Sequence, residues 1–400
     1  MHLENRTSNL NKIKNQVSEG SNEELTKNYQ KNNAALALKD GTVILGSGLG
    51  YPTRVVGEVV FNTGMVGYTE ALTDPSYKGQ ILTFTYPLIG NYGVPDYNNL
   101  DQWKLPKYFE SDKIQATGAI MHELCAEPNH WASTKTFDDW LYDEKIPGIF
   151  GIDTRSLTTK LREYGVMMGA LEVSSDKIDV DKLKEDLGRA DSYGEQNFVE
   201  QVSIRKPQTY GAGKETIVLM DYGVKYGIVR RLLERNFSVV RVPYDYPLDK
   251  IMTYKPAGVL VSNGPGDPKA CTHTFETIND IMNLDMPVLG ICLGVQMLAL
   301  AAGGNTYKLK YGHRGQNKPC TDLDAGRSYV TSQNHGYAVD AKSLIGTGFK
   351  TWFVNVDDGS VEGIRHDNKP VLAVQFHPEA SPGPYDTDFV FDMFAKIIRR

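Results

Sequence analysis

The sequence predicts an α/β protein: a doubly wound, mostly parallel sheet in the C-terminal half, preceded by a mixed, β-rich N-terminal domain. Two observations lead to this fold class. After residue 215, short apolar runs of strand length alternate with amphipathic helical patterns, as in a parallel sheet covered by helices. Before residue 180, short apolar runs are separated by turn signals, and helical patterns are fewer. The 400 residues, 40% of them hydrophobic, are enough for two domains with separate cores.

Changes in composition divide the chain into four parts. Residues 1–33 are polar and almost free of aromatic residues, so they cannot bury enough apolar surface to offset the entropy lost on ordering. We expect this part to be a disordered tail. Residues 34–180 form the β-rich domain, and residues 181–214 are a charged linker with some helix near 182–187. Residues 215–397 form the parallel α/β domain.

The N-terminal domain is predicted to contain short strands and few helices. Two apolar segments flank Asp40-Gly41, which is a strong signal for a hairpin turn. The expected strands lie at 34–38, 43–45, 57–62, 80–86 and 114–121, and the expected helices at 131–144 and 154–164.

The C-terminal domain alternates strand and helix with regular spacing. In the helix expected at 225–236, Ile228, Leu232 and Leu233 share one face. Ligand sites in such folds lie at the carboxyl ends of the strands, so residues that follow a strand are the first to consider. The expected strands are 216–220, 238–242, 257–262, 287–291 and 371–376; the other expected helices are 274–284, 293–302 and 387–398.

Cys292 follows one of these strands and has a glycine two residues to either side, Gly290 and Gly294. Strand, sharp turn and helix with a reactive residue at the apex form a nucleophile elbow. The glycines are needed because a side chain would block the turn and the close approach of strand and helix. A thiol at a helix N-terminus also lies in a positive partial field that favours the thiolate. We therefore predict a nucleophile rather than a buried structural cysteine.

His377 and Glu379 follow the strand predicted at 371–376, with Pro378 between them keeping the backbone extended. Two residues apart on extended chain, their side chains point to the same side. Together with Cys292 they supply a nucleophile, a general base and a carboxylate that orients the base, which are the parts of an acyl-transfer triad. Taken alone, the His-Pro pair is equally compatible with a simple turn.

Three further segments carry weaker signals. The loop Asn263-Gly264-Pro265-Gly266-Asp267 lets backbone N–H groups approach a ligand and, with the N–H of Leu293, could form an oxyanion hole. Residues 333–337 read from the sequence alone as a polar turn. His313 and Arg314 read as a solvated loop that could contact the other domain.

The composition excludes several function classes. The net charge is −6 with both signs mixed, which argues against a nucleic-acid surface. No apolar run reaches about 18 residues, so no membrane span is predicted. Neither a phosphate-binding glycine loop nor a cluster of metal ligands is visible. The four cysteines are widely spaced, which favours a reduced, cytoplasmic setting over a disulfide framework.

Taken together, the motifs around Cys292, Gly264 and His377 resemble those of class I (triad-type) glutamine amidotransferases. The resemblance covers residues 215–397 and implies the corresponding fold. The N-terminal half is similar to the small chain of carbamoyl-phosphate synthetase, a domain that other glutaminases of this class lack. The segments that carry this second resemblance are 57–65, 67–68, 72–77, 85–93 and 151–155.

The resemblance implies roles for residues that the pattern alone would not select. Cys292, His377 and Glu379 match the family's catalytic residues, and Ser76 of the first domain matches a glutamine contact, so the two domains are expected to meet at the site. Val295 stands where many relatives have His, which we expect to tune the site. The other expected glutamine contacts are Gly264, Gly266, Leu293, Gln296, Asn334, Gly336 and Tyr337.

The implied activity is hydrolysis of L-glutamine through a γ-glutamyl thioester, with the ammonia passed to a large synthetase subunit in a heterodimer or higher oligomer. ATP and Mg²⁺ are expected on that partner, and no cofactor on this chain. Two alternatives stay open: a glutaminase that serves another synthetase, and a non-catalytic interaction subunit. A Cys-His peptidase is a more distant one.

Overall fold

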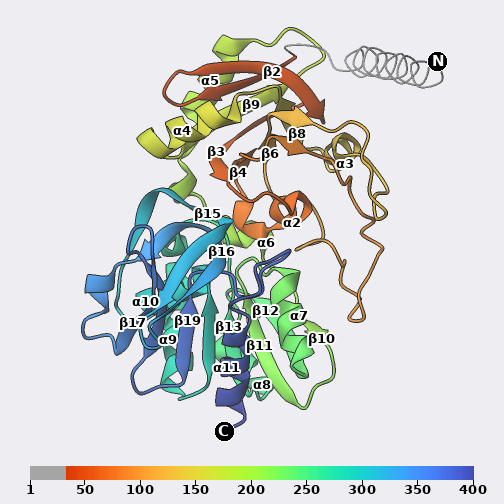
Figure 1. Ribbon diagram of the computed structural model, residues 1–400. Helices are drawn as coiled ribbons and strands as arrows, with labels where there is room; N and C mark the ends of the chain where they lie inside the picture. The colour runs from red at the N-terminus through yellow and green to blue at the C-terminus, as the bar shows by residue number, and fades with distance from the viewer. Residues whose placement is uncertain (1–32) are drawn as a thin grey trace, which may run out of the picture.

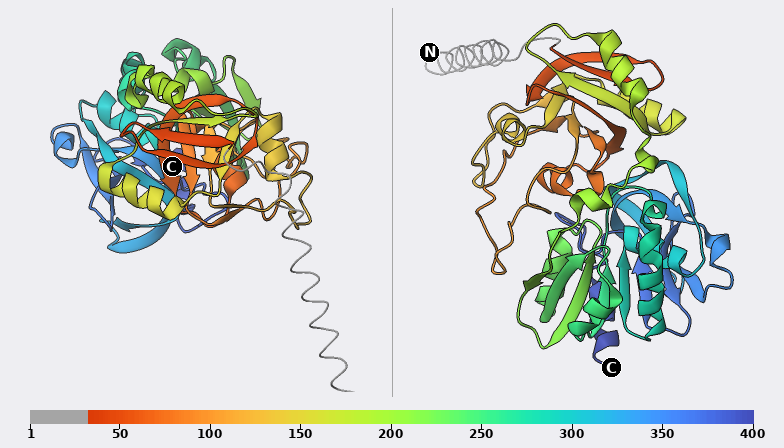
Figure 2. Two further views of the ribbon diagram at one scale, coloured as in Figure 1. Left: turned by 90° about the horizontal axis from the view of Figure 1, so that it is seen from above. Right: turned by 180° about the vertical axis from the view of Figure 1, so that it is seen from behind.

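The computed structural model describes residues 33–400, so the tail expected at 1–33 lies outside the described residues, apart from its last one. Figure 1 shows two bodies, a β-rich one above and a larger one below that is built on a long sheet. The chain passes once from the upper to the lower body, and its C-terminus lies at the far end of the lower body (Figure 2).

The upper body is a closed barrel of seven strands in the order β1-β2-β8-β6-β4-β3-β9. Parallel pairing joins β3, β4, β6 and β8, and the remaining neighbours are antiparallel. The five predicted strands correspond to β1, β2, β3, β4 and β6, although β6 is much shorter than the predicted 114–121. Strands β8 and β9 and the closure into a barrel were not predicted. The bounds are β1 (Ala34–Leu38), β2 (Val43–Gly50), β3 (Arg54–Asn62), β4 (Gln80–Phe84), β6 (Gly118–Ile120), β8 (Pro147–Phe150) and β9 (Met167–Val173).

Helices and loops surround the barrel. The predicted helix at 154–164 is observed as α4 (Thr154–Tyr164). The helix predicted at 131–144 is shorter: α3 (Phe137–Asp143) begins where the Thr136 hydroxyl accepts the N–H of Asp139 as a side-chain cap. The other elements are α2 (Tyr68–Thr73), η1 (Pro75–Tyr77) and the small pair β5 (Leu88–Ile89) and β7 (Glu123–Leu124).

The segment 181–214, expected as a linker, is largely structured. Helix α5 (Val180–Arg189) packs on β1 and β9, in agreement with the helix predicted near 182–187. The next elements, η2 (Tyr193–Glu195) and α6 (Val199–Val202), lie between the two bodies. Strand β10 (Gln208–Tyr210) then adds an antiparallel edge to the lower sheet.

The lower sheet has ten strands in the order β10-β12-β11-β13-β14-β19-β18-β17-β15-β16. The α/β class is confirmed, and the central strands β12, β11, β13, β14 and β19 are parallel, but the sheet as a whole is mixed because an antiparallel half continues it. The parallel strands are β11 (Glu215–Asp221), β12 (Phe237–Pro243), β13 (Gly258–Val261), β14 (Val288–Ile291) and β19 (Val371–Val374); the antiparallel ones are β15 (Thr306–Asp322), β16 (Arg327–Val339), β17 (Phe349–Asn355) and β18 (Val361–His366).

Helices cover both faces of the parallel part. Alternate side chains of β11 point to opposite cores: Ile217 and Leu219 join the helices α7 (Tyr226–Glu234) and α11 (Phe389–Ile398). Val218 and Met220 face α8 (Leu248–Thr253), α9 (Phe275–Asn283) and α10 (Leu293–Ala301). Two 3₁₀ turns, η3 (Pro268–Thr274) and η4 (Ala341–Leu344), complete this body. Among the described residues, no helix has the length and apolar character that crossing a bilayer requires.

Candidate active site

Cys292 stands at the apex of a sharp turn between β14 and α10. Its φ of 55° and ψ of −103° lie in a region that non-glycine residues rarely adopt. The Cys292 N–H donates to the Val374 carbonyl at 2.8 Å, which holds the turn against β19. A Cβ on Gly294 would overlap the Val261 carbonyl, and one on Gly290 would lie 2.6 Å from Leu298 Cδ1. The turn and its two glycines therefore have the geometry predicted for a nucleophile elbow.

His377 and Glu379 follow β19 on the neighbouring strand end, both fully buried. The two side chains are joined by a hydrogen bond of 2.7 Å between His377 Nδ1 and Glu379 Oε1. The backbone N–H of His377 donates to Ser332, which fixes the segment to β16. The other ring nitrogen, Nε2, has no hydrogen-bond partner, and the Cys292 thiol is close enough to influence the pKa of the imidazole. The structure thus brings the three predicted residues together.

Buried charges set the protonation of this group. Burial lowers the pKa of His377, but the Glu379 carboxylate and Cys292 outweigh it and raise that pKa to about 10. Burial raises the pKa of Glu379, but Lys225 and His377 lower it to about 2. Lys225 Nζ lies 2.9 Å from Glu379 Oε1 with its side chain only 6% exposed. The geometry therefore favours a carboxylate paired with a protonated imidazole near neutral pH.

Sequence reasoning missed several residues of this arrangement. Lys225 was placed in a predicted helix with no sign of a buried ion pair. Glu110 lies behind it, fully buried, and accepts the N–H of Gly227 at 3.0 Å. Gln375 was assigned to a buried strand, yet its amide contacts Cys292 Sγ at 3.7 Å and Gln296 Nε2 at 3.0 Å. No sequence spacing connects these residues with Cys292 or His377, because each of them reaches the site from a different segment of the chain.

Cys292 opens into a pocket at the junction of the two bodies. All eight residues expected to contact glutamine line this pocket: Ser76, Gly264, Gly266, Leu293, Gln296, Asn334, Gly336 and Tyr337. Val295, by contrast, is buried in the core that α10 shares with α9. The glycine loop runs close to β11, since a Cβ on Gly264 would overlap the Tyr222 carbonyl. The N–H of Gly266 is already bonded to the Tyr193 hydroxyl at 3.1 Å.

Side-chain hydrogen bonds connect the upper body to the pocket, and two of them involve the segment that carries Ser76. Ser76 Oγ accepts from Asn263 Nδ2 at 3.0 Å, and Asp74 Oδ2 accepts from Asn334 Nδ2 at 3.0 Å. Asp74 also accepts the N–H of Ser76 and so caps η1. The contact between domains that Ser76 implied is present, and Asp74, which the sequence did not single out, contributes to it.

Two predictions from the antiparallel half are wrong. Residues 333–337, read as a polar turn, lie in the middle of β16 with four of the five buried. His313 and Arg314, read as a solvated loop, are buried in β15 with 5% and 3% of their surfaces exposed. The possible contact with the other domain is observed, because Thr63 N–H donates to the Arg314 carbonyl at 3.1 Å. Arg314 is buried at the pocket between the two bodies, whereas the His313 side chain is enclosed by Glu362, Asp358 and Asn355 of the lower body.

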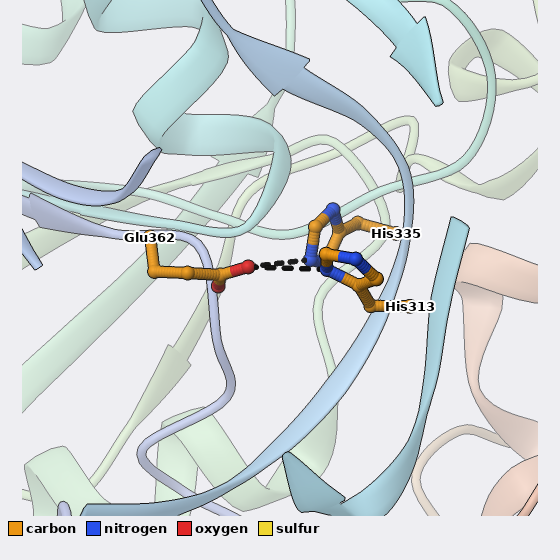
Figure 3. Close-up of side chains that lie close together, drawn as sticks. All are labelled: His313, His335 and Glu362. Atoms are coloured by element: carbon orange, nitrogen blue, oxygen red, sulfur yellow. Dashed lines mark hydrogen bonds and ion pairs between the residues drawn. The ribbon is translucent and has the colours of Figure 1, made fainter. Parts of the chain in front are cut away.

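His313, His335 and Glu362 form the one group of three metal-type ligands in the described part of the chain, and sequence reasoning missed it because three strands contribute (Figure 3). Both imidazoles point at one carboxylate oxygen, at 3.2 and 3.3 Å. Burial lowers the pKa of His313, but Glu362 and Asp358 outweigh it and raise that pKa, whereas burial lowers the pKa of His335.

The hydrogen bonds around this group do not favour a metal ion. The Asn355 amide nitrogen lies 3.3 Å from the same Glu362 oxygen, and its amide oxygen accepts the N–H of Asp357, which fixes the donor toward the cluster. A protonated His313 between Glu362 and Asp358 already balances the buried charge. We therefore interpret the group as a buried ion-paired cluster that ties β15 and β16 to β18.

Each of the two bodies matches a known protein family. Residues 218–397 match the family described as glutamine amidotransferase class-I, and residues 36–171 match that of the carbamoyl-phosphate synthase small chain, CPSase domain. A carbamoyl phosphate synthase small chain of Pyrococcus furiosus is 49% identical over 366 residues, 91% of this chain and 97% of that protein. An arginine-specific small chain of Neurospora crassa is 45% identical, over 91% of this chain and 80% of its own length. The multifunctional protein ura1 of Schizosaccharomyces pombe is 44% identical over 92% of this chain and 17% of its own length.

Proposed function

The chain belongs to the family of carbamoyl-phosphate synthase small chains, and on this premise we propose that it is the glutaminase subunit of such an enzyme. It hydrolyses L-glutamine and passes the ammonia to a large synthetase subunit, which makes carbamoyl phosphate from bicarbonate and ATP. ATP and Mg²⁺ belong to that partner. The observation that carries the proposal is the Cys292 elbow next to the ion-paired His377 and Glu379, in a pocket lined by all the expected glutamine contacts.

The first half-reaction forms a thioester. The Cys292 sulfur, its proton held on His377, attacks the side-chain amide carbon of glutamine, and the C–S bond forms as the carbonyl oxygen gains negative charge. Backbone N–H groups of Leu293 and the glycine loop stabilise this oxygen. Because the Gly266 N–H already donates to Tyr193, we assign the loop's contribution to Gly264. The imidazolium then donates its proton to the leaving nitrogen, the C–N bond breaks, and ammonia departs.

The second half-reaction is hydrolysis. Neutral His377 takes a proton from water, and the resulting hydroxide adds to the thioester carbon. The C–S bond breaks, glutamate is released, and the sulfur and imidazole return to their starting charge state. The carboxylate of Glu379 stabilises the imidazolium in both halves, and Lys225 keeps Glu379 ionised.

A second cavity supports a separate route for ammonia. It is lined by His377 and Asn334 and by residues of α2, and Cys292 is not among its lining residues. Ammonia released next to His377 therefore has space on a side that the glutamine pocket does not occupy. We also place the reaction in the cytoplasm, which the four free cysteines of the described chain support.

A Cys292→Ser variant, assembled with the large subunit, tests the proposal. We expect glutamine-dependent carbamoyl phosphate synthesis to fall by at least about 10³-fold, because the nucleophile is lost. Synthesis from free ammonia should remain, since the partner's sites are unchanged. A Cys125→Ser variant is the matched control: this thiol lies in the upper body, outside the pocket, and its loss should leave glutamine use intact.

Two results would contradict the proposal. One is undiminished glutaminase activity in the Cys292→Ser variant. The other is failure of a glutamine-analogue alkylator to label Cys292 in the unmodified enzyme, which would return the chain to a non-catalytic role. Co-purification with a different synthetase would instead redirect the ammonia to another product.

A further inference from the structure

Arg314 is a buried cation without a counter-ion. Only 3% of its surface is exposed, and its Nη1 donates to the Tyr311 carbonyl at 2.7 Å. Its Nε has no hydrogen-bond partner, and no carboxylate of residues 33–400 forms an ion pair with the guanidinium. The other buried arginine of the lower sheet, Arg241, is paired with Asp221 at 2.8 Å. Since a buried charge is unfavourable unless it is compensated, Arg314 lacks a partner that Arg241 has.

The position of Arg314 points to what that partner is. The residue lines the same pocket as Cys292 and stands directly opposite Asn334 in the pairing of β15 with β16. The strand register shifts on both sides of this short paired stretch, between Lys308 and His313 and between Gly315 and Lys318. Such irregularities re-aim side chains and are common next to active sites. The local backbone thus presents Arg314 to the pocket.

The other charges of the pocket are already balanced. Lys308 Nζ lies 2.6 Å from Glu58 Oε1, and the same carboxylate accepts from Gln80 at 3.0 Å. His335 lies 3.3 Å from a carboxylate oxygen of Glu362, which is not among the lining residues of the pocket. The pocket therefore carries one uncompensated positive charge, that of Arg314, and an anionic group on the ligand would neutralise it.

We propose that Arg314 binds the α-carboxylate of glutamine and makes the pocket specific for substrates that carry this group. The inference rests on the proposed glutaminase function and extends it to a residue outside the expected contacts. A guanidinium presents a planar fork of N–H donors that matches a carboxylate, and Nε is among those still without a partner. The ion pair forms only when substrate binds, so Arg314 is charged and unpaired until then.

The experiment compares two substrates in the assembled enzyme: L-glutamine and its α-amide, in which a neutral carboxamide replaces the carboxylate. Ammonia release gives kcat/KM for each substrate. Arg314→Gln removes the charge at similar length, and Arg314→Lys keeps a charge without the fork. Lys310→Gln is the matched control, because Lys310 is an exposed cation on the same strand outside the pocket.

We expect the unmodified enzyme to prefer glutamine over the α-amide by about 10- to 100-fold, the range for a charge-assisted hydrogen-bonded pair. Arg314→Gln should abolish this preference, mainly through a higher KM for glutamine, and Arg314→Lys should keep part of it. Lys310→Gln should retain all of it. Because the readout is a ratio, partial unfolding of a variant affects both substrates equally.

An unchanged ratio of the two kcat/KM values in Arg314→Gln would overturn the proposal. This includes the case in which kcat/KM falls equally for both substrates, which indicates a structural role. Failure of the proposed function looks different. In that case the unmodified enzyme releases no ammonia from glutamine, whatever stands at position 314.

Discussion

At the scale of single residues, the charge on Glu379 controls the protonation of the site. The carboxylate accepts from both His377 and Lys225, and all three side chains are at least nine-tenths buried. Because the interaction takes place away from solvent, salt screens it little. The imidazole is thereby held protonated near neutral pH, which is the state that the proposed mechanism requires for donation to the leaving nitrogen.

Replacing Glu379 by Gln should shift the pH dependence of the reaction. Burial alone lowers the pKa of His377, so loss of the carboxylate moves that pKa down from about 10. The imidazolium then deprotonates at lower pH, and the alkaline limb of kcat/KM for glutamine should move down by at least about one pH unit. The pH profile between about 6 and 10.5 measures this.

The control for this prediction is Glu362→Gln, which removes another fully buried carboxylate that faces imidazoles but lies outside the triad. Its alkaline limb should stay in place. A limb that moves equally in both variants would show that a general loss of buried charge, and not the pairing with His377, sets the profile.

A residue of this site could be predicted from the sequence only where the pattern that identifies it lies within a few neighbouring residues. Cys292 could be predicted because its glycines and its strand-to-helix position lie within five residues. His377 and Glu379 could be predicted from their spacing after a strand. Lys225 could not, because its partner is 154 residues away in the chain. Arg314 was misassigned to a solvated loop, since a charged residue gives no sequence sign that another domain will cover it.

At the scale of elements, the contact of β13 with α10 shapes the elbow. Gly294 lies against the Val261 carbonyl, so any side chain there must push strand and helix apart. Main chain on both sides leaves little room to adjust. The position of Cys292 relative to His377 therefore depends on a residue that has no chemistry of its own.

A Gly294→Ala substitution should lower the free energy of unfolding by about 3 kcal/mol and abolish most glutaminase activity. Chemical denaturation and kcat measure the two effects. Gly188→Ala is a matched control: this glycine lies in α5, and nothing stands within 4 Å of an added Cβ. It should raise the free energy of unfolding by about 0.5–1 kcal/mol, because alanine reduces the conformational entropy of the unfolded chain. Equal effects of the two substitutions would contradict the steric argument.

The parallel strands and their helices could be predicted, because buried strands read as continuous apolar runs and helices as period-3.6 patterns. The predicted helix 387–398, for example, differs from α11 only in its first turn. The antiparallel half could not be predicted. Strand β15 breaks its alternation at two register shifts, and its buried positions include His313 and Arg314, which look like solvent-facing residues.

At the scale of the whole molecule, the pocket belongs to both bodies. Ser76 and Asp74 come from the upper body and bond with Asn263 and Asn334 of the lower one. No local pattern could reveal this contact, and Ser76 was chosen only through the resemblance to a family. Neither body alone contains all the residues that line the pocket.

The link between the bodies can be measured with a double-mutant cycle. Asp74→Ala and Asn334→Ala should each reduce kcat/KM for glutamine, because Asp74 orients the Asn334 amide through a 3.0 Å hydrogen bond. The double variant should lose less transition-state stabilisation than the two single variants lose together, with a coupling energy of about 1–2 kcal/mol. Asp74→Ala combined with Arg399→Ala, at the distant end of α11, should be additive (Figure 1). Additivity of the first pair would mean that Asp74 acts on the pocket by another path.

The closed barrel has a consequence for how this molecule meets others. Each of its seven strands has a hydrogen-bonded neighbour on both sides, so within the described residues the barrel itself offers no free edge to which another chain could add a strand. The free edges of the upper body are those of the β5–β7 pair, whose strands are only two residues long. The lower sheet ends on one side in β10, which is three residues long and therefore a poor template. Association through these surfaces must depend on side chains and loops, and uncontrolled β-aggregation is disfavoured there by topology alone.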